Sequence, residues 1–404
     1  MKKRMGRTIV LFAAVMCLSC LWGISTSAKT YTMSPKTKPC DNTQRAKNYN
    51  KYTKHYFLLR SYLMKIEKQG GGKLVLKKGT YKISNTIYVP SNTQIVLKNG
   101  VTLKKLKNSG AKDMPAASSM FQFISWKKAK KTGVYGKYKG EKNISLIGKG
   151  KAVIDLGKLK MNKKDVIGII MGHNQKVTIE GITFKNMRYG HMIEMDASKN
   201  VTVKNCTFTG FKASGKHNKE AINLDTPDKK RDGFKSKWSK KDGTPNINVV
   251  IENCTFRNLE AGVGTHQYTG NKYHTNVTIQ NCSFDKVQTA IRVLNWKNAT
   301  ITKNTFSNCS PNARYPYAMF FAGVQGMQFS YNTFTNCGVG DKLLEFWCDK
   351  GYDAKQTIYD ATYSEITEEQ AAVMLTTNTA VNCGYCKIYN SPYYVDFTAP
   401  PGEE

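Results

Sequence analysis

A nine-residue phrase recurs along this chain. It reads NVTVKNCTF up to Phe208, NVVIENCTF up to Phe256 and NVTIQNCSF up to Phe284. Weaker copies end at positions 184, 306 and 334. A period in the twenties is typical of stacked units that bury one another's apolar faces. The alternation within each phrase predicts a strand with Val203 and Cys206 among its inward residues. Because no helical pattern separates the strands, we predict an all-β chain, a parallel β-helix.

Two further columns of the phrase carry structural residues. Cys206, Cys254 and Cys282 occupy the same place in successive copies. We predict that they form an inward ladder of small, reduced side chains rather than disulfides. An asparagine precedes each of these cysteines, and asparagine tolerates left-handed backbone and hydrogen-bonds along a stack. The recurring phrase is therefore predicted to be scaffold.

The first 28 residues are typical of a signal peptide. Four basic residues precede an apolar stretch from Ile9 to Trp22, and small residues at Thr26 and Ala28 suit a cleavage site. Cys20 leaves a lipoprotein signal as the alternative. No later apolar run is long enough to span a bilayer. We therefore expect a secreted monomer with no membrane association after signal cleavage.

Positive charge dominates the composition. The chain has a formal net charge of +34, and the 58 basic and 28 acidic residues that follow the signal leave +30. Such a field attracts polyanions, so we expect an anionic polysaccharide partner and retention on an anionic cell wall. A nucleic-acid partner is not expected, because the chain has no helical element to read one.

The chain divides into four predicted parts. The signal is followed by an N-terminal cap segment, residues 29–72, whose apolar spacing over 56–68 predicts an amphipathic helix. The β-helix is predicted to run over residues 73–345, and residues 346–404 form a C-terminal cap and tail. A lysine-rich insert at 227–245 interrupts the coils and carries Trp238.

A second strand precedes each phrase, and these strands align with one another over residues 167–172, 191–196, 220–225, 261–266 and 289–294. Their third and fifth positions are apolar or small, as in Ile222 and Leu224, and are predicted to face the core. Their fourth and sixth positions must then point outward. Side chains that are scattered in the sequence are thereby predicted to meet on one face.

The predicted outer face is rich in titratable groups. Its fourth positions include Glu194, Asn223 and Arg292, and its sixth positions include Asp196, Asp225 and His266. Neighbouring rungs lie about 4.8 Å apart, so stacked carboxylates should repel and raise one pKa, which suits an acid/base pair. Glu194 and Asp225 are diagonal neighbours about 8 Å apart, within the range of an inverting glycosidase pair.

The opening of the predicted β-helix resembles that of the pectin-lyase-like superfamily of right-handed β-helices. The resemblance covers roughly residues 70–344 and includes the amphipathic helix, Gly70-Gly71-Gly72, Lys-Gly-Thr-Tyr at 78–81 and Val-Pro-Ser-Asn at 89–92. Within that superfamily the chain is most similar to the polygalacturonase family of glycoside hydrolases. The likeness implies a right-handed helix whose rungs present a catalytic cleft.

The polygalacturonase motifs are matched in part. The family's Asp-Asp pair falls on Lys219-Glu220, and its Arg-Ile-Lys falls on Arg292-Val293-Leu294. Its histidine falls on Ala261, with His266 further along the rung, and its first aspartate falls on His191. The likeness supports the rung order and the cleft position. It also indicates that this chain is not an ordinary polygalacturonase.

These patterns favour an extracellular glycoside hydrolase that acts on an acidic or pectin-like polysaccharide without a cofactor. Five residues are predicted to share the catalytic roles: Glu220, Asp225, Asp196, Glu194 and His266. Six are predicted to bind substrate: Arg292, Asn223, His191, Asn295, Trp238 and Lys219.

Two alternatives remain open from the sequence. The first is a polysaccharide lyase of the pectate type, in which Glu194, Asp196 and Asp225 hold Ca²⁺ through their oxygen atoms. The second is a non-catalytic β-helix that adheres to wall or host glycans through its charge. The lyase predicts unsaturated products and loss of activity with EDTA, whereas the adhesin predicts salt-sensitive binding without the carboxylates.

Overall fold

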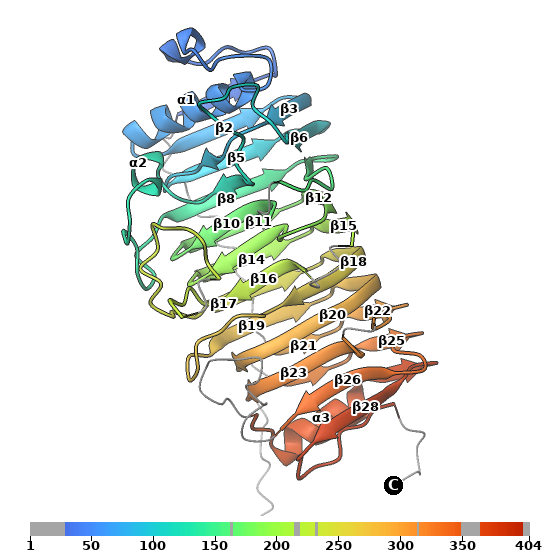
Figure 1. Cartoon of the computed structure of the whole chain (residues 1–404). Helices are drawn as coiled ribbons and strands as arrows, with labels where there is room; N and C mark the ends of the chain where they lie inside the picture. The colour runs from blue at the N-terminus through green and yellow to red at the C-terminus, as the bar shows by residue number, and fades with distance from the viewer. Residues whose placement is uncertain are drawn as a thin grey trace, which may run out of the picture.

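The protein is a long stack of parallel coils (Figure 1). The computed structural model describes residues 29–161, 165–213, 219–230, 233–312, 315–348 and 364–398. The predicted signal peptide therefore lies outside the described residues. Each regular coil contributes three short strands, and each strand pairs in parallel with its counterpart in the next coil.

The strands form three faces that run the length of the stack. The first face holds the opening strand of each phrase: β1 (Thr30–Met33), β2 (Gly72–Leu76), β5 (Thr93–Leu97), β8 (Lys142–Gly148), β11 (Gln175–Glu180), β14 (Lys199–Lys204), β17 (Ile247–Glu252), β19 (His274–Gln280), β21 (Thr300–Thr302) and β24 (Gln328–Ser330). The second face holds the closing strand of each phrase: β3 (Gly79–Ile83), β6 (Val101–Lys105), β9 (Val153–Asp155), β12 (Thr183–Met187), β15 (Thr207–Phe211), β22 (Thr305–Ser307), β25 (Thr333–Thr335) and β27 (Thr379–Val381).

The third face holds the strands that precede the phrases: β4 (Ile87–Tyr88), β7 (Ser119–Gln122), β10 (Ile167–Gly172), β13 (Ile193–Asp196), β16 (Glu220–Asp225), β23 (Tyr317–Gln325), β26 (Lys342–Trp347) and β28 (Tyr385–Tyr389). Two long strands, β18 (Thr255–Gly264) and β20 (Ser283–Lys297), turn the corner and belong to both the second and the third face.

Helices lie at both ends of the stack (Figure 1). Helix α1 (Lys54–Lys68) buries Leu58, Leu59, Leu63 and Ile66 and contacts β2, β3 and β4. Helix α3 (Glu368–Thr377) begins with a capping box between Thr367 and Gln370 and lies against β24. The short helices are η1 (Asn42–Arg45) and α2 (Trp126–Ala129). Strand pairing extends past both expected limits of the β-helix, since β1 pairs with β2, and β27 and β28 pair with β25 and β26.

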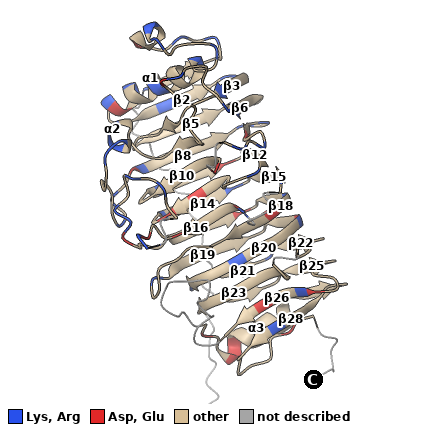
Figure 2. Ribbon diagram, viewed as in Figure 1, with Lys and Arg blue, Asp and Glu red and all other residues tan. Residues whose placement is uncertain are grey.

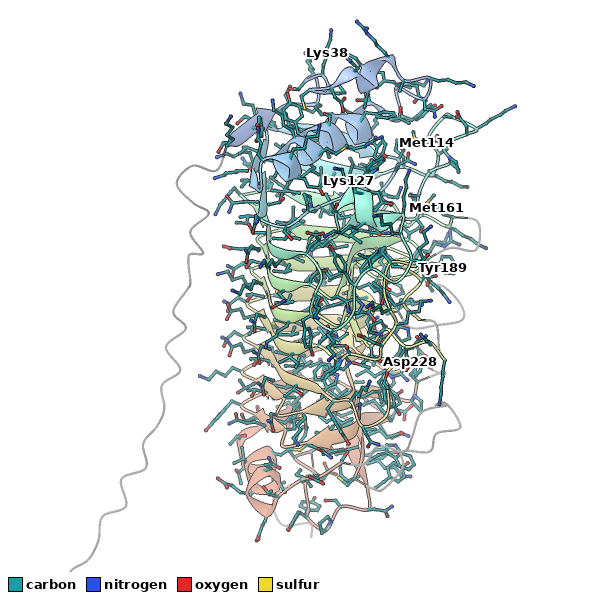
Figure 3. All side chains as sticks on the ribbon, turned by 90° about the vertical axis from the view of Figure 1, so that its left-hand side faces the viewer. Lys38, Met114, Lys127, Met161, Tyr189 and Asp228 are labelled. Carbon is teal, nitrogen blue, oxygen red and sulfur yellow. The ribbon has the colours of Figure 1, made fainter. Side chains whose placement is uncertain are left out.

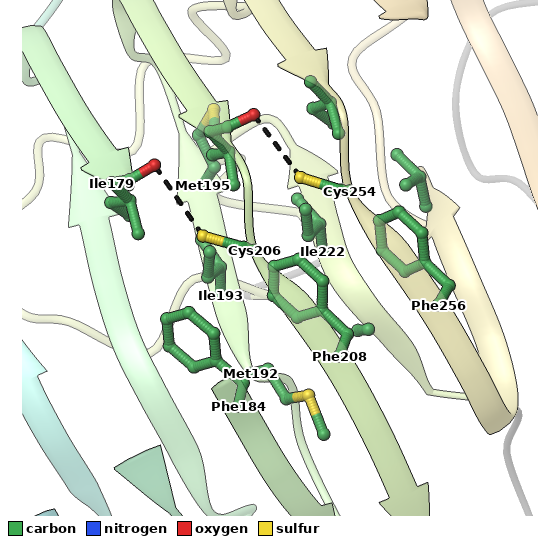
Figure 4. Close-up of a cluster of buried hydrophobic side chains, with 14 of the residues drawn as sticks. Ile179, Phe184, Met192, Ile193, Met195, Cys206, Phe208, Ile222, Cys254 and Phe256 are labelled. Carbon is green, nitrogen blue, oxygen red and sulfur yellow. Dashed lines mark hydrogen bonds between the residues drawn. The ribbon is translucent and has the colours of Figure 1, made fainter. Parts of the chain in front are cut away.

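The phrase residues fill the core as predicted. Val203, Cys206 and Phe208 are all buried, and Figure 4 shows the phenylalanines of successive coils lying over one another. Ring centroids in this stack are 4.6–5.1 Å apart from Phe184 through to Phe334. The predicted cysteine ladder is also confirmed, because the nine cysteines in the described ranges are free and Cys206 and Cys254 point at backbone carbonyls.

Asparagine side chains link the coils. Near the C-terminal end, the buried Asn332 accepts a hydrogen bond from the backbone N–H of Asn304 and donates to the carbonyl of Ile301 and to Asn378. Nearer the middle, the amide of Asn248 donates to Asn200 across one rung at 2.9 Å. Many of the phrase asparagines also have positive φ, about 51–57° at positions 200, 205, 248 and 298. Asparagine tolerates this left-handed region better than most residues.

Replacing Asn332 with alanine should destabilise the protein by about 1–3 kcal/mol, because the buried Asn304 N–H and Ile301 carbonyl lose their partner. Chemical denaturation monitored by circular dichroism measures the loss. The control is Thr333→Ala, since Thr333 is exposed on the adjacent position. Equal stability of the two variants would show that the ladder contributes nothing.

Candidate functional site

The third face carries the predicted site residues in the predicted register. Asp196 pairs with Asp225, and Glu194 pairs with Asn223, between β13 and β16. The next two steps bring Gly264 and then Arg292 into the Asn223 row. The alternate residues Ile193 and Ile222 point inward (Figure 4). The strand pairing therefore brings the carboxylates together on one face, as predicted.

The carboxylates do not line an open cleft, which corrects the sequence-based expectation. Asp196 and Glu220 are 1% exposed, and Asp225 and Glu194 are also buried. The small hollow at this place is lined by Glu220, Ala261, Thr289, Arg292 and Tyr315 and is too narrow for a water molecule. A larger hollow of about 500 Å³ lies away from the carboxylates, between residues 107–118 and Met161. The side chain of His266 is 25% exposed, which makes it more accessible than the carboxylates of Glu220 and Asp225 beside it.

The lysine-rich insert covers one side of the carboxylates. Trp238 and Phe234 lie over Gly172, where an added Cβ would meet both rings within 2.7 Å, and Gly172 pairs with Asp196. Both aromatic side chains are buried, together with Tyr135 and Ile170. The prediction that Trp238 binds substrate is therefore wrong, because the buried tryptophan packs the insert against the face.

The loops beside the site come from the same side of successive coils. Figure 3 shows Met114, Met161 and Tyr189 one below another, each in the loop that leads into β7, β10 or β13. Figure 2 shows that these loops and the insert carry many of the lysines and arginines. The buried carboxylates therefore lie behind a strongly basic rim.

A histidine tethers the insert to the stack. The Nε2 atom of His173 lies 2.7 Å from the Ser239 hydroxyl, and its Nδ1 lies 2.6 Å from the Lys137 carbonyl. Ser239→Ala should therefore cost about 1–2 kcal/mol and speed amide exchange in residues 233–245, since a buried ring nitrogen loses its partner. Hydrogen exchange read by mass spectrometry measures this. Ser236→Ala, on the same segment and half-exposed, is the matched control; similar exchange in both variants would contradict the tether.

His266 is the centre of the polar contacts. Its Nδ1 lies 3.0 Å from Asn223 Oδ1 and 3.4 Å from Glu220 Oε2, and its Nε2 lies 3.4 Å from Asp225 Oδ2. The other oxygen of Asp225 accepts hydrogen bonds from the backbone N–H groups of His266 and Gln267, both at 3.0 Å. The turn after β18 is thus held against β16 by one carboxylate.

The predicted binding residues divide into two groups. His191 joins the site: its ring stacks on His266 with centroids 5.4 Å apart, and its Nδ1 lies 2.8 Å from the Glu220 carbonyl. Arg292 packs over the Tyr315 ring at 5.3 Å. Lys219 forms an ion pair with Asp165 at 3.3 Å at the edge of the site.

Asn295 does not belong to the site. It is fully buried, and its amide donates to the carbonyls of Thr269 and Lys272. The prediction that it binds substrate is corrected, because these two bonds hold the loop after β18. The sequence also missed Tyr315, which lines the narrow hollow beside Arg292. Residues 310–316 have no counterpart in the other copies of the repeat, so the sequence has no signal that would place this tyrosine.

The buried groups have divergent proton affinities. Burial, reinforced by the nearby Asp225, raises the pKa of Glu194 to about 8. Burial also raises the pKa of Asp196 and of Asp225 above their ordinary values. For Glu220, burial acts in the same direction, but the positive charges facing it hold its pKa below the usual range. Glu194 and Glu220, which lie on adjacent rungs, therefore differ strongly in their tendency to ionise.

The histidines differ in the same way. Burial lowers the pKa of His191 to about 3. Burial also disfavours the charged form of His266, but Asp225 and Glu220 outweigh it and raise its pKa. His266 therefore carries the positive charge that the neighbouring carboxylates require.

The Ca²⁺ set of the lyase alternative is not well matched by this geometry. Ca²⁺ takes about six to eight oxygen ligands, several of them water. One oxygen of Asp225 is committed to two backbone N–H groups and the other faces His266. Asp196 is closed off beneath the insert. Glu194, Asp196 and Asp225 therefore do not offer the open, oxygen-rich shell that Ca²⁺ needs.

Comparison with known proteins agrees with the architecture. The sequence matches the family described as "Right handed beta helix region" over residues 141–306 and again over residues 239–395. Among curated proteins it is 27% identical to plasmin and fibronectin-binding protein A of Streptococcus pneumoniae (strain ATCC BAA-255 / R6) over 224 residues, which are 50% of this chain and 29% of that protein. This chain therefore spans less than a third of that relative.

Two solved structures share the fold. Both are of PfbA, a surface adhesin of Streptococcus pneumoniae. One has a TM-score of 0.63 and 19% identity over 89% of this chain and 96% of the other. The second has a TM-score of 0.60 and 18% identity over 89% of this chain and 79% of the other. Within the described ranges, no helix has both the length and the apolar character to cross a membrane. With family matches that together run from residue 141 to residue 395, the chain belongs to the right-handed β-helix family.

Proposed function

We propose that this protein is an extracellular enzyme that cleaves an acidic polysaccharide by carboxylate acid/base catalysis. The observation that carries the proposal is the burial of Glu194, Asp196, Glu220 and Asp225 on adjacent rungs of one face. Burying carboxyl groups costs free energy, and a scaffold has no need of them, since apolar residues would fill the same places. Strongly perturbed carboxyl groups that gather in one place are a common property of catalytic sites.

The geometry supports distinct roles for two of these groups. Glu194 holds its proton up to about pH 8 and is suited to protonate a leaving glycosidic oxygen. Asp225 is its diagonal neighbour on the next strand, about 8 Å away by sheet geometry, which is within the spacing of an inverting pair. Burial raises the pKa of Asp225, and the positive charge of His266 opposes that shift.

The basic surroundings indicate the substrate class. Lys219 and Arg292 flank the carboxylates, and the chain has a net charge of +34. Positive groups at such positions favour sugars that carry carboxylate or sulfate groups. The partly exposed side chain of His266 marks the more accessible edge, and substrate is proposed to approach there.

A panel of neutral and anionic polysaccharides tests the proposal, with products read by mass and by ultraviolet absorbance. A hydrolase releases reducing ends without a new absorbing double bond. An absorbance rise that EDTA abolishes would replace the hydrolase with the lyase. Absence of products from every polysaccharide in the panel would count against an enzyme of either class.

The second candidate is a surface protein that binds host or wall polymers without catalysis. The 27% identity to a plasmin and fibronectin-binding protein favours it, as does the positive charge. It predicts saturable, salt-sensitive binding to fibronectin or to anionic wall polymer. Such binding would persist unchanged in a variant that lacks Glu194 and Asp225.

The protonation of Glu194 has a consequence for stability. Its folded pKa of about 8 lies above the ordinary value of 4.5, so the folded state binds more protons than the unfolded state between these values. Stability therefore falls as pH rises from about 4.5 to 8. Glu194→Gln should remove this component, so the variant gains stability relative to wild type across that interval. Thermal melts at matched pH values measure the difference, and parallel curves would show that Glu194 ionises normally.

A further inference from the structure

Two acceptor oxygens, one from Glu220 and one from Asn223, face the same ring nitrogen of His266. A single N–H at that nitrogen cannot donate fully to both. Glu220 Oε2 and Asn223 Oδ1 lie 3.4 Å and 3.0 Å from the same ring nitrogen, Nδ1 of His266. Glu220 is 1% exposed, and its Oε2 atom makes no hydrogen bond that meets geometric criteria among the described residues. A buried carboxylate oxygen in this position is costly unless a cation lies beside it.

A second histidine completes the group. One ring nitrogen of His191, one of His266 and a carboxylate oxygen of Glu220 all lie within 4.8 Å of one another. In a tetrahedral centre with metal–ligand bonds of about 2.0–2.1 Å, ligand atoms are about 3.3 Å apart. The 3.4 Å between His266 Nδ1 and Glu220 Oε2 already has this spacing. The Nδ1 atom of His191 lies 3.7 Å from the same Glu220 oxygen, close to this spacing.

The surroundings also hold the ligands in the orientation that a metal requires. A histidine that binds a metal usually donates its other ring N–H to a carboxylate or a backbone carbonyl. His266 turns its Nε2 toward Asp225 Oδ2 at 3.4 Å, which leaves Nδ1 for the metal. His191 places its Nδ1 2.8 Å from the Glu220 carbonyl and 3.7 Å from Glu220 Oε2, so the same edge of the ring faces both groups.

We propose that His191, Glu220 and His266 form a binding site for a divalent transition-metal ion, with Asn223 Oδ1 beside it. Two imidazoles and one carboxylate favour ions such as Zn²⁺ over Ca²⁺, which prefers oxygen ligands. Four carboxylates face Lys219, Arg292 and the His266 ring, and a divalent ion that displaces the Nδ1 proton of His266 would bring the positive charge that these carboxylates require. The proposal does not depend on the enzymatic one, because metal binding is measured on protein without any substrate.

The test uses the intact chain after treatment with EDTA and gel filtration. Isothermal titration with Zn²⁺, and metal analysis after removal of excess ion, should give one Zn²⁺ per chain and a higher melting temperature. Ca²⁺ should have no such effect. Cobalt(II) should give the visible absorption of a tetrahedral nitrogen/oxygen centre, which a site made of thiolates would not reproduce.

Variants of single ligands test whether the ion binds at this site. Glu220→Gln and His266→Asn should each weaken Zn²⁺ binding at least about 100-fold, the upper range for losses at supporting residues alone. Cys40→Ser controls for zinc held by the exposed thiol and should bind like wild type. Melting of each metal-free variant confirms that it is folded. No stoichiometric binding by wild type, or undiminished binding by both folded variants, would overturn the proposal.

Discussion

Replacing Glu194 with glutamine is expected to lower kcat by about 10²–10⁴-fold, the usual contribution of a positioned general acid. The amide keeps the size of the side chain and removes the proton that Glu194 retains up to about pH 8. Asp225→Asn should have a loss of similar size, because the base that activates water is then missing. Initial rates on whichever polysaccharide the panel identifies measure both effects.

Two comparisons make this result specific. Glu180→Gln changes a half-exposed carboxylate on the first face, which is paired with Lys204, and should retain wild-type rates. Because the two site carboxylates act as a unit, the double variant should lose little more than the worse single variant. Full activity in both single variants would remove Glu194 and Asp225 from the mechanism, even if the protein remains an enzyme.

The largest loss of stability is expected from Phe256→Ala. The Phe256 ring lies between Phe208 at 4.9 Å and Phe284 at 4.6 Å, and it is completely buried. Removing it leaves a cavity between two stacked rings, which typically costs about 3–5 kcal/mol. The strands that carry Phe208 and Phe284 are held in place by their backbone pairing with the Phe256 strand. Neither ring can therefore move far enough to fill the cavity.

Urea denaturation of wild type and variant measures the change, with Val381→Ala as the control because Val381 is 62% exposed. A solenoid need not unfold in one step, so the midpoint should be followed by two probes. A change below about 1 kcal/mol would show that the stack can collapse around the missing ring.

The β-helix could be predicted because two independent sequence patterns indicate it. Each phrase alternates inward and outward residues, and the same residue types return at equivalent places. A shift of one residue in any strand would turn Phe208 or Val203 outward, so the pattern admits a single register. The same register sets the pairing of Asp196 with Asp225 on the neighbouring strands.

The covering of the site was not predictable. Trp238 stands among lysines in an insert without a repeat, which is the usual pattern of an exposed aromatic. Its burial depends on Gly172, 66 residues earlier, whose missing side chain leaves room for the ring. The partners of Asn295 were equally hidden, because its amide donates to the carbonyls of Thr269 and Lys272 in a distant loop. Contacts of this kind join segments that share no periodicity.

The asparagine and phenylalanine ladders have a mechanical consequence. Along the three faces, the described strands of each coil pair with those of the coil before it and the coil after it. A force applied along the chain at either end would therefore load one set of rung bonds at a time, and the stack should unravel in steps of a single turn. A molecule built this way would lengthen under tension by giving up its outermost turns, while the carboxylates near its middle stayed assembled until late.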